Sequence, residues 1–248
     1  MLKVRIIPIL TFNGFALVKT KQFENPRMVG NPVQAARVYN SRGVDELVFL
    51  DIFATKQNRK INLKVVKDVL KECFMPVGVG GGVQTLNDIN DLLQIGADKV
   101  VIKSQAILKP KFIKEASDFF GSQCICISVD VIKKNEKYLI HNDLNENIEM
   151  FDFLRMIQDL GAGEILLNSV NNDGMMSGFD MNLNKTVIDS VNLPIVSIGG
   201  GGNVTHFEDL FVNTKCEAAG ASSIFHFTQY TPLDIKLGLK KNGKNVRI

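Results

Sequence analysis

Two glycine-rich segments recur in this sequence, each directly after a short run of β-branched residues. The first covers residues 80–82, after Val77–Val79, and the second covers residues 199–202, after Ile195–Ile198. Consecutive glycines leave backbone N–H groups unshielded by side chains, and a helix that begins there adds partial positive charge, so such a loop can bind phosphate. Glycines also mark ordinary turns, so one loop alone would be weak evidence. Two loops in matching contexts favour two phosphate sites.

The glycine segments belong to a repeat that runs through the whole chain, with its halves offset by about half the chain length. Strand-like apolar runs recur at this offset in both halves. The corresponding positions are Gly80 and Gly199, Glu46 and Glu164, and Thr11 and Asp130. The length of 248 residues fits a barrel of eight strands and eight helices, which typically needs about 250 residues. We therefore predict an α/β fold, a (β/α)₈ barrel of two duplicated half-barrels, as one domain over residues 1–248.

The composition narrows the class of protein. A net charge of +3 is small for this size, and no basic run is long enough to indicate nucleic acid. The basic segment from Lys236 to Arg247 is expected to be a solvated last helix and terminus. We expect no metal, cofactor or disulfide, because the four cysteines show no ligand spacing. The chain has no signal-peptide pattern and no run of 18 apolar residues, which predicts a soluble, cytoplasmic protein without a membrane segment.

The expected elements alternate between strand and helix along the chain. A long loop over 12–30 follows the first strand and is expected to be a lid or binding loop. Asn31 and Pro32 form a helix start, and Thr85 with Asp88 resembles a capping box. A small hairpin is expected around 138–141. The expected strands are 4–10, 46–51, the run before Gly80, 99–103, 124–130, 164–168, the run before Gly199, and 218–221.

In such a barrel the functional site lies at the carboxyl ends of the strands. We expect one phosphate pocket from Gly82, Lys103 and Ser104, and a second from Gly200, Gly201, Ser222 and Ser223. Asp130 ends the fifth strand opposite Thr11, where a carboxylate can act as a general acid or base, or only as a structural hydrogen-bond acceptor. The remaining candidates on this rim are Asp51, Asn168, Asp173 and Gly174.

The chain resembles the cyclase subunit of imidazole glycerol phosphate synthase over essentially its whole length. Several separate segments carry the resemblance, and together they are highly specific. They are 5–7, 45–52, 79–82, 96–100, 120–123, 161–167, 173–174 and 225–227.

The resemblance implies a partner and a substrate class. That family is a barrel of duplicated halves that receives ammonia from a HisH-type glutaminase at the opposite, amino-terminal pole, as a heterodimer. Its substrate carries a phosphate at each end, and Lys19 matches a retained binding residue. The family's ammonia gate is a ring of four charges, matched here by Arg5, Glu46, Lys99 and Glu164. Without the resemblance, these charges would be read as ordinary salt bridges at one pole.

Two departures from the family pattern bear on the chemistry. The family's first catalytic aspartate is Thr11 here, and a hydroxyl cannot replace a carboxylate as an acid or base near neutral pH. An asparagine beside the first phosphate is Lys103. The first loop is similar to that of second-copy members of the family linked to the amidation of surface or flagellar sugars, in the segments 17–20, 23, 25–26 and 29–30.

Three functions therefore stay open. The first is an ammonia-handling subunit of a glutamine amidotransferase that serves a separate sugar-amidating enzyme, with a bis-phosphate or sugar-type small molecule at its site. The second is an authentic cyclase of histidine biosynthesis with an altered first acid/base position. The third is a non-catalytic barrel that only binds and activates the glutaminase.

Overall fold

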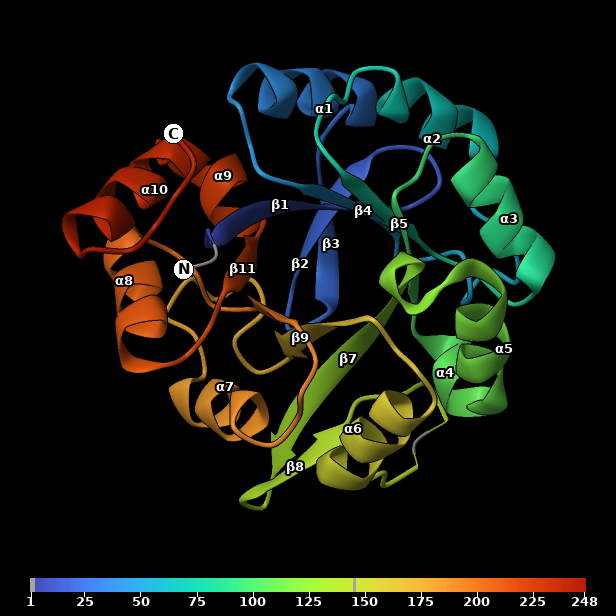
Figure 1. The fold of residues 1–248 in the computed structure, drawn as a ribbon. Coiled ribbons are helices and arrows are strands. Elements are labelled where there is room, and N and C mark those ends of the chain that lie inside the picture. Colours follow the sequence, from blue (N-terminus) through green and yellow to red (C-terminus); the bar gives the residue numbers. More distant parts are fainter. Residues whose placement is uncertain (1–2, 145) are drawn as a thin grey trace.

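The computed structural model describes residues 3–144 and 146–248, and its centre is a closed parallel β-barrel (Figure 1). Strand β1 pairs with β4 on one side and with β11 on the other, which closes the cylinder. This confirms the predicted (β/α)₈ barrel. The barrel strands, in spatial order, are β1 (Arg5–Phe12), β4 (Leu47–Asp51), β5 (Val77–Gly80), β6 (Lys99–Ile102), β7 (Ile125–Lys134), β9 (Glu164–Ser169), β10 (Ile195–Ile198) and β11 (Ala218–Ala221).

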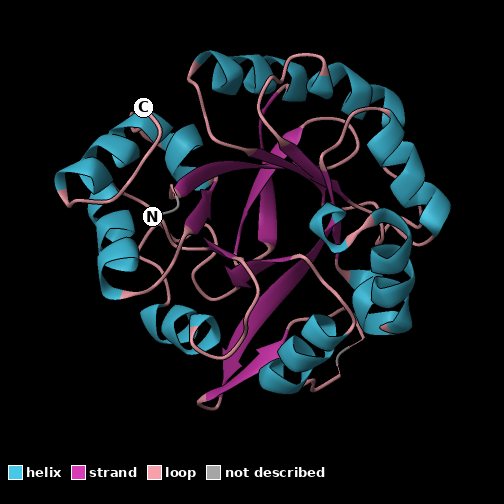
Figure 2. Cartoon of the chain, in the orientation of Figure 1, coloured by secondary structure: helices cyan, strands magenta, loops and turns pink. Residues whose placement is uncertain are grey.

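Helices surround the barrel on its outside, as Figure 2 shows. Asn31 caps the first helix ahead of Pro32, and Thr85 and Asp88 form the predicted reciprocal capping box. The main apolar core lies between these helices and the outward side chains of the strands. The helices are α1 (Pro32–Ser41), α2 (Leu63–Leu70), α3 (Leu86–Gln94), α4 (Ser104–Leu108), α5 (Lys111–Phe120), α6 (Met150–Asp159), α7 (Met181–Ile188), α8 (Val204–Asn213), α9 (Ser223–Phe227) and α10 (Pro232–Lys241), with a 3₁₀ turn at Ser122–Cys124.

The interior of the barrel is filled by alternate residues of the strands, because successive side chains of a strand point to opposite faces. A separate apolar cluster occupies its middle, and it includes Ile7, Val48, Val101 and Leu166. Charged residues lie below this layer, where the strands begin, and polar residues lie above it, where they end. We call these two ends the N-terminal and C-terminal mouths.

The segment after β1 is not the long irregular loop that the sequence suggested. It forms an antiparallel hairpin, β2 (Leu17–Lys21) and β3 (Glu24–Gly30), which continues the sheet from the end of β1. Its turn residues Gln22 and Phe23 both have positive φ, 50° and 67°. Two-residue turns of this kind normally use asparagine and glycine, so the usual turn signal is missing from the sequence.

Two further differences concern β7 and the basic C-terminal segment. Strand β7 runs four residues beyond Asp130 and pairs with β8 (Lys137–Ile140), which confirms the expected small hairpin. The last helix is present as expected, but Lys236 is not solvated, because only 2% of it is exposed. No helix in the described part of the chain combines the length and apolar character needed to cross a membrane.

Candidate functional site

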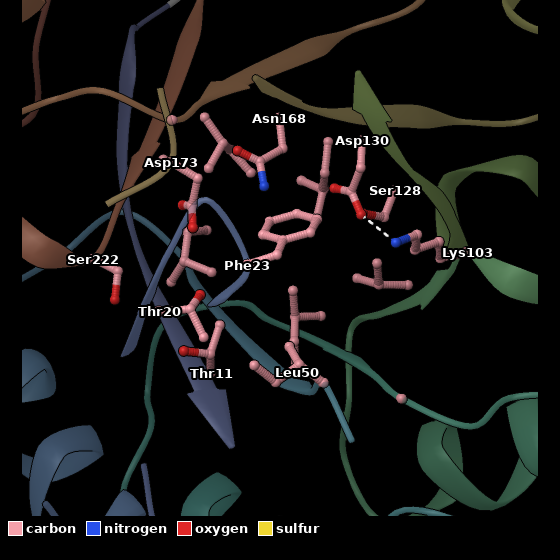
Figure 3. A pocket seen from close by; sticks show the side chains of 18 of the residues that line it. Thr11, Thr20, Phe23, Leu50, Lys103, Ser128, Asp130, Asn168, Asp173 and Ser222 are labelled. Atoms are coloured by element: carbon pink, nitrogen blue, oxygen red, sulfur yellow. Dashed lines mark ion pairs between the residues drawn. The ribbon is translucent and has the colours of Figure 1, made fainter. Parts of the chain in front are cut away.

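A cavity of about 210 Å³ opens at the C-terminal mouth (Figure 3). The strand ends and the loops after them supply its walls, as expected for this fold. All the rim residues singled out from the sequence line it, together with Lys19. They are Thr11, Lys19, Asp51, Gly82, Lys103, Ser104, Asp130, Asn168, Asp173, Gly174, Gly200, Gly201, Ser222 and Ser223.

The second glycine loop and the start of α9 form a polar corner of this cavity. Gly200 has φ of 107°, and a Cβ at Gly201 would lie 2.8 Å from the Phe207 ring, so side chains are excluded here. The Oγ atoms of Ser222 and Ser223 are buried and have no hydrogen-bond partner among the described residues. Buried hydroxyl groups are normally paired, so two unpaired ones beside glycine peptide groups that no side chain shields fit an anionic ligand.

The first glycine loop has a similar backbone but a different surrounding. Gly81 and Gly82 have φ of 126° and 68°, and a Cβ at Gly82 would lie 2.6 Å from the carbonyl oxygen of Arg59. Ser104 begins α4 beside this loop. The Lys103 ammonium, however, contacts a carboxylate of the neighbouring strand. The two halves therefore keep the glycine geometry and differ in the side chains around it.

Soaking crystals with inorganic phosphate tests both pockets. We expect density at the Gly200–Ser223 corner, because its hydroxyls are unpaired, and density at the Gly82–Ser104 corner as the equivalent site of the first half. Gly201→Ala should abolish the former and leave the latter, since the added methyl group meets the Phe207 ring. Density in neither corner would contradict both phosphate assignments.

Thr11 and Asp130 end their strands at the cavity, where the sequence placed them. The Thr11 hydroxyl donates a hydrogen bond to the carbonyl oxygen of Val18 in the hairpin. Asp130 is buried, and its carboxylate lies 2.5 Å from Nζ of Lys103, the ion pair dashed in Figure 3. The Thr11 hydroxyl is thus hydrogen-bonded to the backbone, and the Asp130 carboxylate is ion-paired with an ammonium group.

The β2–β3 hairpin reaches into the same cavity. The Phe23 ring lies between Asp173 and Lys103 in the view of Figure 3, and it is 5.5 Å from the Lys103 ammonium. It also meets the His141 ring edge-on, with 5.3 Å between centroids. His141 is not among the site residues predicted from the sequence. The only sequence feature that could have pointed to His141 is its ionisable side chain, next to the β7–β8 hairpin that follows Asp130. No local pattern placed it at the cavity.

The pKa of His141 lies below its ordinary value, first because burial disfavours the charged imidazole and second because Lys103 is close. Burial, followed by Lys19, lowers the pKa of His226 in the same way. Folding therefore disfavours protonation at both sites, so the free energy of unfolding should fall as the pH drops below about 6.5. Urea unfolding at several pH values measures the effect. NMR titration should show the His141 pKa moving up in Lys103→Met, and an unchanged value would contradict the assignment to Lys103.

Two further rim carboxylates are held in ion pairs. Asp173 accepts from Nζ of Lys19 at 3.0 Å, and both side chains are buried. Burial raises the pKa of Asp173, and the Lys19 ammonium opposes that shift. Asp51 is bound by both terminal nitrogens of Arg59, at 2.6 and 2.9 Å. Among the described residues, no group of three or more histidine, cysteine, aspartate and glutamate side chains could hold a metal ion.

At the N-terminal mouth the four charged residues form one closed ring. Arg5 donates to Glu46 at 2.6 Å and to Glu164 at 2.7 Å. Lys99 donates to the same two carboxylates, at 2.8 and 2.6 Å. Burial lowers the pKa values of Arg5 and Lys99, but their ion pairs with Glu46 and Glu164 outweigh it, so both values are raised. The two positive and two negative formal charges of the ring cancel.

Comparison with known proteins gives consistent matches over the whole chain. A family model described as histidine biosynthesis protein matches residues 5–231. The imidazole glycerol phosphate synthase subunit HisF of Petrotoga mobilis is 42% identical over 253 residues, covering all of both chains. The subunit of the same name from Staphylococcus aureus is 42% identical over 252 residues, and that from Clostridium botulinum is 39% identical over 253, again with full coverage of both chains.

Proposed function

Because this chain belongs to the HisF family of imidazole glycerol phosphate synthase subunits, an enzyme family, we propose that it is the ammonia-receiving barrel of a glutamine amidotransferase. We propose that the cyclase activity of the chain itself is weak. A HisH-type glutaminase docks at the N-terminal mouth and releases ammonia there. The ammonia enters through the charged ring and reaches the cavity at the C-terminal mouth.

The charged ring supports the proposed entry of ammonia at the N-terminal mouth. Each of its cations is bound by two carboxylates and each carboxylate by two cations, so the closed form leaves no free charge. A small polar molecule can replace one of these contacts at a time by hydrogen bonding to the freed group. Above the ring the proposed route passes between the apolar side chains of the barrel interior, such as Ile7 and Leu166, where uncharged ammonia is favoured over ammonium.

The ion pair between Lys103 and Asp130 is the observation that carries the proposal of weak cyclase activity. General acid–base catalysis by two positions needs a free carboxylate at each, and here one is a threonine and the other is neutralised by a lysine. Loss of one acid/base group typically costs about 10² to 10⁴ in rate. The cavity then keeps its ligand-binding groups while the cyclisation step is slow.

A finer proposal concerns where the ammonia goes. The resemblance of the first loop to second-copy members of the family favours a separate sugar-amidating enzyme as the acceptor. Such an enzyme would meet the C-terminal mouth, and the cavity would hold a bis-phosphate or sugar-type molecule.

An authentic cyclase of histidine biosynthesis is the second candidate. It is favoured by identities of 39–42% over full length to HisF subunits, by the retained Asp130 and by the two glycine corners. A barrel that only activates its glutaminase is the third candidate, and the closed ring would then be structural.

One assay separates the first two functions, and a second tests the amidotransferase role that all three share. With the bis-phosphate substrate of the family and ammonium salt, we expect little cyclase turnover; robust turnover that Asp130→Asn abolishes would contradict the proposal and support the authentic cyclase. Mixed with a HisH-type glutaminase, the protein should form a heterodimer and stimulate glutamine hydrolysis. Absence of a complex would contradict the amidotransferase role itself.

A further inference from the structure

A buried ion pair joins the last helix to the N-terminal mouth. Nζ of Lys236, on α10, lies 2.8 Å from Oδ1 of Asp45 and 3.3 Å from the carbonyl oxygen of Gly43. The side chains of Lys236 and Asp45 are only 3% and 8% exposed. A buried lysine needs a partner of this kind, because an unpaired charge at such a position is costly. Lys236 is thus fixed on the segment that leads into β4.

The second oxygen of Asp45 binds a different strand. Its Oδ2 accepts a hydrogen bond from the backbone N–H of Ile6 at 3.0 Å. The backbone pairing of β1 with β4 starts only at Ile9 and Val48, and the same register extended backwards would place Ile6 opposite Asp45. The Asp45 side chain therefore supplies the link between the two strands below the point where their ladder ends.

Asp45 and the Ile6 backbone that its carboxylate holds are each directly next to a ring residue in the sequence. Ile6 follows Arg5, and Glu46 follows Asp45. The C-terminal segment adds a contact on the other side of Arg5, where the N–H of Val4 donates to the carbonyl oxygen of Asn245 at 2.9 Å. Figure 1 shows α10 beside β1, and α10 packs against β1.

We infer that Lys236 and Asp45 are positioning residues of the charged ring, holding Arg5 and Glu46 at the separation that lets both cations reach both carboxylates. The inference rests on the proposed function for its meaning, since the ring matters to activity only if ammonia passes through it. When Lys236 is lost, nothing on α10 fixes the Asp45 carboxylate, which can then turn away from the Ile6 backbone N–H. The Arg5 and Glu46 side chains then separate, and Lys99 loses part of its pairing.

The chemical reactivity of Lys99 reports the ring directly. Acetylation needs the neutral amine, and the ion pairs that raise the pKa of Lys99 suppress it. In Lys236→Met, acetylation of Lys99, followed by mass spectrometry of the folded protein, should be about tenfold faster, as expected for a loss of roughly 1.4 kcal/mol of ring stabilisation. Lys236→Arg keeps the charge and should restore the wild-type rate.

Lys19→Met is the matched control, because it removes an equally buried ion pair, Lys19 with Asp173, at the opposite mouth. It should leave Lys99 acetylation unchanged. An unchanged rate in Lys236→Met, or an equal rise in Lys19→Met, would overturn the inference. Should Lys236→Met not fold, Asp45→Asn takes its place with the same expected rise, and no rise there would overturn the inference too.

Ammonia transfer from a bound glutaminase separates this inference from the proposed function. With a HisH-type glutaminase bound, Lys236→Met should also lower the share of hydrolysed glutamine whose ammonia reaches an acceptor. Faster Lys99 acetylation with unchanged ammonia transfer would support the positioning role and contradict the gate. Lys99 acetylation at the wild-type rate in Lys236→Met would contradict the positioning role and leave the proposed function standing.

Discussion

The double variant Thr11→Asp, Lys103→Asn should gain cyclase activity, by about 10² or more over the wild-type protein. The first substitution would restore a carboxylate at the end of β1, and the second would free Asp130 from the ammonium group 2.5 Å away. Turnover of the family's bis-phosphate substrate with ammonium salt measures the gain. Because both carboxylates are needed in the same step, we expect each single variant to gain far less than the two together.

Two controls belong with this experiment. Adding Asp130→Asn to the double variant should remove the gain, which shows that the new activity uses both carboxylates. A crystal structure of the double variant should show the hairpin shifted, because an ionised aspartate cannot donate to the Val18 carbonyl as Thr11 does. Wild-type turnover already as fast as that of the double variant would contradict the view that Thr11 and Lys103 disable ring closure.

The variant Glu164→Gln should open the charged ring and separate glutamine-driven from ammonium-driven chemistry. It leaves Arg5 and Lys99 sharing only one carboxylate, that of Glu46. Removing one partner of a fully buried pair costs about 3–5 kcal/mol, and because Arg5 and Lys99 keep 28% and 21% of their side chains exposed, we expect about 2 kcal/mol of lost unfolding free energy. Urea denaturation measures this loss.

For function, the ratio of glutamine-driven to ammonium-driven product should fall in Glu164→Gln, because ammonia from the partner leaks before it enters the barrel. The ratio can be measured in the cyclase-competent double variant with glutaminase bound. Glu72→Gln is the control, since Glu72 forms an exposed pair with Arg37 and should change little. Equal behaviour of the two variants in both assays would contradict the gate.

The sequence was sufficient for the barrel because its repeat is carried by local patterns. The β-branched runs, the glycine segments and the capping signals at Asn31 and Thr85 each depend on nearby residues, and each appears in the structure as expected. The β2–β3 hairpin was missed for the opposite reason. Its turn is made by Gln22 and Phe23, whose residue types do not normally signal positive φ.

The pairings within the site could not be read from the sequence, because they join residues far apart in the chain. Lys103 was placed at a phosphate pocket, and its ion pair with Asp130 was not anticipated. Lys236 sits in the most basic segment and was expected in solvent, yet it is buried against Asp45. In both cases the charge of the residue was known and its partner was not. The ring at the N-terminal mouth was anticipated only through the resemblance to a known family.

The apolar layer containing Ile7, Val48, Val101 and Leu166 has an evolutionary consequence. It lies between the ion pairs of the ring and those of the cavity, and none of these ion pairs crosses it. Exchanging residues around the cavity therefore breaks none of the ion pairs of the ring at the N-terminal mouth. Under the proposed function, a lineage could therefore change its product chemistry and keep the same glutaminase partner.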